Sequence, residues 1–279
     1  MTVSSLQGVT HACFGLSYLV ALLLELARLL WPRAGSGWRI TALAFGAAGL
    51  LAHTYYIIAH QPTPAAPSGS LLLLGWVFAL FYLYGTIHHA RQALALFVLP
   101  VVIGLVGLSY VLLRTGDSTP PLDVLHWLSG DRFWGAVHGS LIWFAAVGVT
   151  VGFLASLMYL VQARRLRNKV NPGQVVPLFS LERLETMNRR ALNLAFPLLT
   201  AGLLVGLLIL NHAHGLGDNW LSLKVVSTAG LWVVFLVLLY LRYGTHVPSR
   251  RLAMLSIAAF GILIVALATA HPFVTGAAP

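Results

Sequence analysis

Eight long apolar stretches constrain this chain more than any other feature of its sequence. Each is long enough to cross a hydrocarbon core of about 30 Å as a helix, in which every backbone polar group is satisfied internally. With 58% apolar and 9% charged residues, the chain leaves no room for a sizeable soluble domain. The sequence therefore predicts an all-α polytopic membrane protein with eight transmembrane helices, over roughly 11–31, 40–60, 71–88, 93–113, 138–161, 191–210, 221–241 and 252–270.

Positive charge alternates from one link between spans to the next. The links after spans one, three, five and seven are basic, and the fifth is the most basic, with Arg164, Arg165, Arg167, Lys169, Arg183, Arg189 and Arg190. Basic links face the cytoplasm in membrane proteins, so both termini are expected outside. The net charge of +10 follows from this topology and calls for no nucleic-acid partner. The expected partner of the basic face is the lipid bilayer.

Most of the eleven histidines are expected at the outer face. His53 lies within span two, in its outer half. Neutral imidazole is a common metal ligand and the usual axial ligand of haem iron. One histidine at a helix end is ordinarily an interfacial side chain, but seven on one face indicate a binding site: His11, His60, His126, His138, His212, His214 and His271.

The remaining motifs narrow the function further. Cys13 is the only cysteine, which excludes an intramolecular disulfide and the CxxCH haem-attachment motif. Any haem is therefore expected to be b-type and non-covalent. The phosphate-binding, metalloprotease and hydrolase motifs are absent, so we do not expect an enzyme. No basic segment precedes the first apolar stretch, which is therefore expected to be a retained span rather than a signal peptide.

Local spacing predicts helices in two links. In the outer loop 115–137, Pro120 and Pro121 can open a short helix that lies on the membrane. In the inner fifth link, Ser180 can cap a helix that runs through Glu182 into span six. We expect one membrane domain over 1–279, made of spans one to four (1–114), this outer loop, and spans five to eight (138–279).

Two polar or small-residue patterns lie within the spans. Glu25 and Arg28 are three residues apart in span one and can pair on one helix face. Pro197 predicts a kink in span six, and Gly202 and Gly206 predict a close contact with another helix.

Two segments resemble a known family. The first begins with Ala-Val-His138-Gly-Ser-Leu-Ile-Trp and ends in Met-Tyr-Leu before a basic run. The second runs from Pro177-Leu-Phe-Ser to Gly206 and continues through Trp220-Leu-Ser-Leu-Lys224 into span seven. Together they resemble the cytochrome c assembly family of haem-handling membrane proteins, closest to its short HemX-like branch with eight spans. The resemblance covers span five to the end.

The resemblance implies haem held at the outer face between two histidines, at positions matched here by His138 and His271. Each is expected at the outer end of its span, and Pro272 ends the helix directly after His271. The family's tryptophan-rich segment is reduced here to Trp220, and Lys224 is placed to pair with a haem propionate.

Further histidines offer alternative ligands. His53 and His60 are seven residues apart, share a helix face, and can hold a second haem. For His53 a hydrogen-bonded packing role is the simpler interpretation. His212 and His214 can replace one of the two favoured ligands, because they end span six at the same face.

The expected function is therefore haem handling in cytochrome c biogenesis or haem homeostasis, in the bacterial cytoplasmic (inner) membrane. Haem is the expected ligand, and other cytochrome c assembly proteins or a tetrapyrrole-pathway enzyme are the expected partners. Two alternatives stay open. One is a scaffold or regulator of tetrapyrrole synthesis or cytochrome assembly that binds no haem and works through the basic fifth link. The other is a small-solute transporter, which the near-absence of acids within the spans disfavours.

Overall fold

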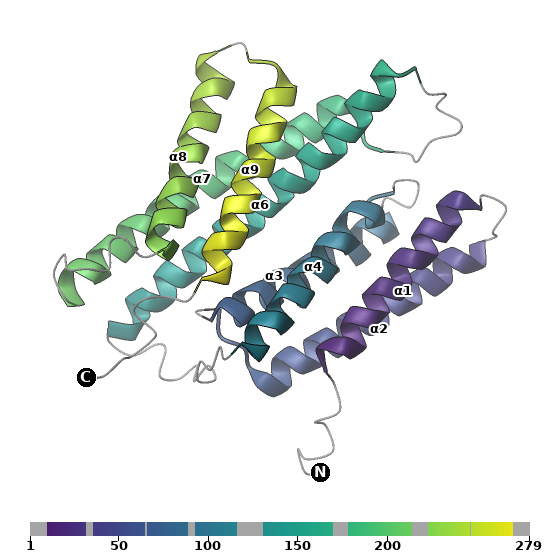
Figure 1. The fold of residues 1–279 in the computed structure, drawn as a ribbon, viewed down its shortest axis with the longest axis horizontal. Coiled ribbons are helices and arrows are strands. Elements are labelled where there is room, and N and C mark those ends of the chain that lie inside the picture. Colours follow the sequence, from purple (N-terminus) through teal and green to yellow (C-terminus); the bar gives the residue numbers. More distant parts are fainter. Residues whose placement is uncertain are drawn as a thin grey trace. The chain divides into compact units, whose positions relative to one another are not determined.

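A computed structural model describes residues 10–31, 36–64, 66–88, 93–115, 131–169, 178–213, 223–245 and 247–269. Over these ranges the secondary structure is helical, with no strand (Figure 1). The helices are α1 (His11–Leu30), α2 (Ser36–His60), α3 (Pro67–His88), α4 (Ala95–Arg114), α6 (Asp131–Arg167), α7 (Leu181–Ala213), α8 (Leu223–Gly244) and α9 (Ser249–Ala268). All eight contain a segment long and apolar enough to cross a membrane, which confirms the predicted fold class.

Helices α6 and α7 extend well beyond the apolar stretches that predicted them. They have 37 and 33 residues, because helical hydrogen bonds continue past the hydrocarbon core into segments whose polar side chains are solvated. Ser180 caps α7 as predicted, since its hydroxyl accepts a hydrogen bond from the Arg183 N–H at 3.3 Å. The surface helix expected near Pro120 lies outside the described residues.

The chain divides into two compact units: the first holds α1, α2, α3 from Leu71 on and α4, and the second holds α6–α9 together with Pro64–Ser70. In the first unit, α1 and α2 pack antiparallel along stripes that repeat every three or four residues. The α1 stripe is buried along its length and consists of His11, Phe14, Tyr18, Ala21 and Glu25. The facing α2 stripe is Arg39, Ala42, Gly46, Gly49, His53, Tyr56 and His60.

Two glycines of the α2 stripe make room for tyrosine rings. A Cβ at Gly49 would lie 2.9 Å from the Tyr18 ring, and one at Gly46 would lie 2.5 Å from the Tyr82 ring of α3. Helix α3 is also tied to α2 by a hydrogen bond from Trp76 Nε1 to Thr54 Oγ1 at 2.8 Å. Close approach of backbone to ring, rather than apolar periodicity alone, therefore sets the spacing of these helices.

In the second unit, α6 and α7 lie side by side along most of their length (Figure 1). Glycines again allow the approach, because a Cβ at Gly148 would lie 2.9 Å from the Cβ of Ala195, and one at Gly202 would lie 2.7 Å from Ile142. This confirms the close contact predicted for Gly202. Small residues at helix interfaces are the usual means of close packing in membranes.

Helix α9 packs antiparallel on α6. The rings of Phe153 and Phe260 stack at 4.1 Å, while Ser156 and Ser256 both accept a hydrogen bond from Asn188 of α7. Residues later in α6 therefore contact residues earlier in α9, as antiparallel helices require. As a result, the N-terminal end of α6 and the C-terminal end of α9 lie at the same end of the unit.

Candidate functional site

His138 is held in the interface between α6 and α7. Its Nδ1 lies 2.7 Å from the carbonyl oxygen of Gly202, a residue 64 positions later in the chain. A carbonyl can only accept, so Nδ1 carries the proton and donates it, and the lone pair of a neutral ring is then on Nε2. The contact thus sets both the tautomer and the orientation of this imidazole.

Two glycines of α7, Gly202 and Gly206, form the surface on which the His138 ring packs. A Cβ at Gly206 would lie 2.7 Å from His138 Cε1 and 2.9 Å from His138 Nδ1, too close for any side chain without displacement of the ring. Gly206 therefore admits the imidazole, and Gly202, one turn earlier, supplies its acceptor. The spacing Gly-x-x-x-Gly, which predicted a helix contact, also provides the binding surface for a histidine.

The other residues expected around His138 have no described side chain. His271, Trp220 and His214 lie beyond the described residues. His212 belongs to α7 and Lys224 to α8, but at these two positions the structure describes the backbone and not the side chain. The pairing of His138 with His271 accordingly stays a prediction.

Three histidines of the first unit, His11, His53 and His60, gather where α1 begins and α2 ends. The His11 ring lies 4.6 Å from the Tyr56 ring, which stacks on His60 at 4.1 Å. His53 stacks on Phe14 at 4.4 Å. Sequence reasoning linked His53 and His60 through their spacing but missed that His11 joins them. The signal was present in the matching three-and-four-residue stripes of the two helices.

The geometry does not fit His53 and His60 as two ligands of one iron. Seven residues rise about 10 Å along a helix, whereas two imidazole nitrogens on one iron lie about 4 Å apart, given metal–nitrogen bonds of about 2 Å. The His53 ring is also fully buried, with Phe14 against one face and the Tyr18 hydroxyl 3.4 Å from its Nδ1. A packing role for His53 accounts for these contacts.

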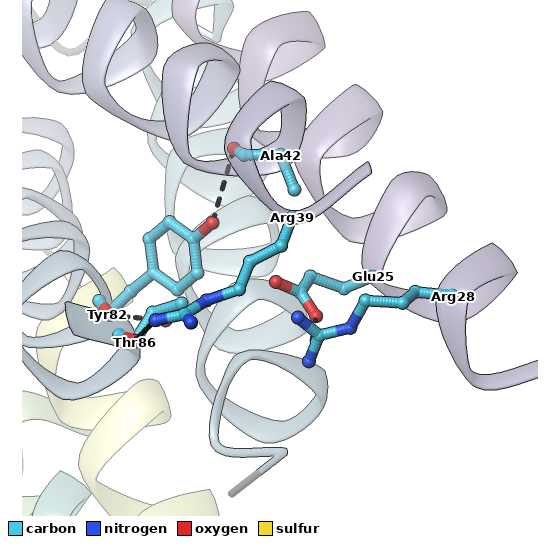
Figure 2. Close-up of polar contacts among 6 residues, drawn as sticks. All are labelled: Glu25, Arg28, Arg39, Ala42, Tyr82 and Thr86. Carbon is cyan, nitrogen blue, oxygen red and sulfur yellow. Dashed lines mark hydrogen bonds and ion pairs between the residues drawn. The ribbon is translucent and has the colours of Figure 1, made fainter. Parts of the chain in front are cut away.

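A charged cluster occupies the opposite end of the same helix pair (Figure 2). Glu25 pairs with Arg28 at 3.2 Å, as predicted, and Figure 2 shows its carboxylate facing Arg39 as well. Arg39 donates to the Thr86 carbonyl at 3.1 Å, and the Tyr82 hydroxyl donates to that of Ala42 at 3.4 Å. The carboxylate is 4% exposed, so the guanidinium groups are what make its burial tolerable.

A bare metal ion finds no obvious site in these clusters. Over the described ranges, no three His, Cys, Asp or Glu side chains gather as metal ligands. The chemistry within reach is that of single, oriented imidazoles, and the ring of His138 is oriented by a main-chain acceptor on another helix.

Comparison with known proteins identifies the family. A family model described as "Cytochrome C assembly protein" matches residues 65–269, which is close to three quarters of the chain. The match begins near the start of α3, well before the segments that carried the resemblance. No curated protein and no solved structure matches the chain. Members of the matched family are haem-handling membrane proteins and are not known as enzymes. The chain belongs to the cytochrome c assembly family and is a multi-pass membrane protein of cytochrome c biogenesis.

Proposed function

We propose that this protein holds haem non-covalently at its outer face, with His138 and His271 as the axial ligands. The hydrogen bond from His138 Nδ1 to the Gly202 carbonyl at 2.7 Å carries the proposal. Histidines that ligate metals usually donate their other ring N–H to a carbonyl or carboxylate, which fixes the tautomer and strengthens the ligand. His138 has this partner, and it comes from a different helix that holds the ring in place.

The arrangement of α6 and α9 supports His271 as the second ligand. The two helices run antiparallel, so Ala268, the last residue of α9, lies at the His138 end of the unit. His271 is the third residue after Ala268, a reach of about 10 Å. His212 and His214 follow Gly202 and Gly206 at the same end of α7 and are the alternative second ligands.

Two further residues complete the proposed site. Lys224 pairs with a propionate carboxylate, since a cation beside an apolar pocket stabilises such a group. Trp220 offers an aromatic face to the porphyrin. Haem is the cargo, and this chain binds and orients it without making or breaking a covalent bond in it. We place the protein in the HemX-like branch and in the bacterial cytoplasmic membrane, where further assembly proteins or a tetrapyrrole-pathway enzyme are its partners.

The test is a visible spectrum of the protein purified in detergent, with added haemin, before and after dithionite. We expect a sharp reduced Soret band and α band that are lost in His138→Ala and in His271→Ala. His88→Ala is the matched control, because His88 is exposed and bonds its own helix at the Tyr84 carbonyl. A protein that stays colourless with haemin, or variants with the unaltered spectrum, would refute the proposal.

One observation favours the scaffold as a second candidate. The facing ends of α6 and α7 expose a dense group of cations, which is Arg164, Arg167, Lys169, Arg183, Arg189 and Arg190. Such a surface fits an acidic partner as well as it fits the inner leaflet. Reversal of four of these charges with an unchanged haem spectrum but lost cytochrome c maturation would support this second role.

A further inference from the structure

A small polar pocket lies where all four helices of the second unit meet. Its wall includes Ser156 of α6, Glu185 and Asn188 of α7, Arg242 of α8 and Ser249 of α9. The space open to the centre of a water-sized molecule is about 10 Å³, which is roughly what one water needs. The pocket is thus too small for a metabolite and large enough for a single small guest.

The orientation of the Asn188 amide follows from its neighbours. Ser156 donates its hydroxyl hydrogen to the Gly152 carbonyl at 2.8 Å, and Ser256 donates to the Leu252 carbonyl at 3.0 Å. Both hydroxyls can then only accept, and both lie within 3.0 Å of Asn188 Nδ2. The amide nitrogen must face the serines, which leaves Oδ1 on the other side. That oxygen is buried and makes no hydrogen bond to the described protein.

A donor in the same pocket complements this acceptor. Arg242 Nη1 is buried and also lacks a hydrogen-bond partner in the described part of the chain. Glu185, beside it, accepts from the Ser249 hydroxyl at 2.8 Å. A guest must therefore accept from a guanidinium and donate to an amide oxygen. A halide has no hydrogen to donate, and an alkali or ammonium ion has no lone pair to offer.

We propose that this pocket binds one water molecule, which accepts from Arg242 Nη1 and donates to Asn188 Oδ1. A buried water typically makes about three hydrogen bonds to otherwise unsatisfied groups, and the Glu185 carboxylate is the third partner. Asn188 already joins α7 to α6 and α9, so the water extends this clamp to α8. The site depends on none of the haem ligands.

Coupled unfolding tests the bridge. In detergent micelles titrated with dodecyl sulfate, we compare Asn188→Leu, Arg242→Met and the double variant. If one water links the two side chains, either substitution removes the bridge. Each single substitution lowers the folded-to-unfolded ratio by some factor. The decrease in the double variant should be about fivefold smaller than the product of these two factors, which is equivalent to about 1 kcal/mol of coupling. The control pair is Asn188→Leu with Thr200→Val, about 18 Å apart along α7, whose losses should multiply.

An isotope measurement identifies the guest. Infrared difference spectra in H₂¹⁶O and H₂¹⁸O should show a water O–H stretch in the wild-type protein that is missing from Asn188→Leu and from Arg242→Met. If Asn188→Leu fails to fold, Asn188→Asp keeps the acceptor oxygen and should keep the band. Multiplicative losses would overturn the proposal. So would coupling without an isotope-sensitive band, because the two side chains would then interact directly.

Discussion

The substitution Gly206→Ala tests most directly whether the His138 ring packs against Gly206. The new methyl group would lie 2.7 Å from His138 Cε1, and ordinary contact begins near 3.4 Å, so the ring must retreat by about 0.7 Å. The 2.7 Å bond to the Gly202 carbonyl would lengthen towards the weak limit. A lost hydrogen bond costs about 0.5–1.5 kcal/mol and overpacking about 1–3 kcal/mol. Alanine has a higher helix propensity than glycine, which stabilises the variant by about 1 kcal/mol and leaves a net destabilisation of about 0.5–3.5 kcal/mol.

The assay is reversible unfolding in mixed micelles, with Gly230→Ala of α8 as the matched control. Nothing lies within 4 Å of a Cβ at Gly230, so that variant should be neutral or slightly stabilised. The decisive measurement repeats Gly206→Ala in a His138→Ala background. Once the imidazole is gone, the methyl group has space, and the substitution should cost nothing.

A Gly206→Ala protein as stable as the control, or an equal penalty with and without His138, would refute the reasoning. The first result would mean that the ring does not sit on Gly206. The second would mean that some other contact of α7 carries the cost.

Three further substitutions test the remaining contacts. Gly46→Ala should destabilise the first unit by about 1–3 kcal/mol, because the added Cβ meets the Tyr82 ring at 2.5 Å; the same unfolding assay measures it. Glu25→Gln should destabilise the protein by leaving the partly exposed Arg28 guanidinium without its counter-ion, and Arg28→Gln in the same chain should recover part of the loss; a full loss in the double variant would contradict the pairing. Ser180→Ala should cost about 0.5–1 kcal/mol by removing the cap of α7, whereas Ser180→Asp should cost little.

Much of the local structure was predictable from sequence. The eight spans, the cap at Ser180 and the Glu25–Arg28 pair all depend on residues within one helical turn of each other or on the apolar content of a segment. Both are visible in the chain itself. The ends of α6 were not, because a helix that leaves the bilayer keeps its hydrogen bonds while its side chains turn polar.

The candidate site was predictable only in part. The resemblance to a family singled out His138, and the alternation of charge between the links predicted that most of the histidines share one face, which stays a prediction. The acceptor on Gly202 was not, because 64 residues separate the two and no pattern specifies which carbonyl a ring will meet. The convergence of His11 with His53 and His60 was missed for the same reason.

By itself, the sequence determined that this protein spans a membrane as a bundle of helices, since an uninterrupted apolar stretch of about 20 residues has the length that a helix needs to cross the hydrocarbon with its backbone polar groups satisfied. Tertiary structure alone decided which helix faces meet, and hence which imidazole is oriented and which polar atoms enclose the pocket at Asn188. Apolarity cannot specify those contacts inside a bilayer, because lipid is as apolar as leucine. The contacts between helices are set instead by glycines that allow close approach and by buried hydrogen bonds, and both act between residues far apart in the chain.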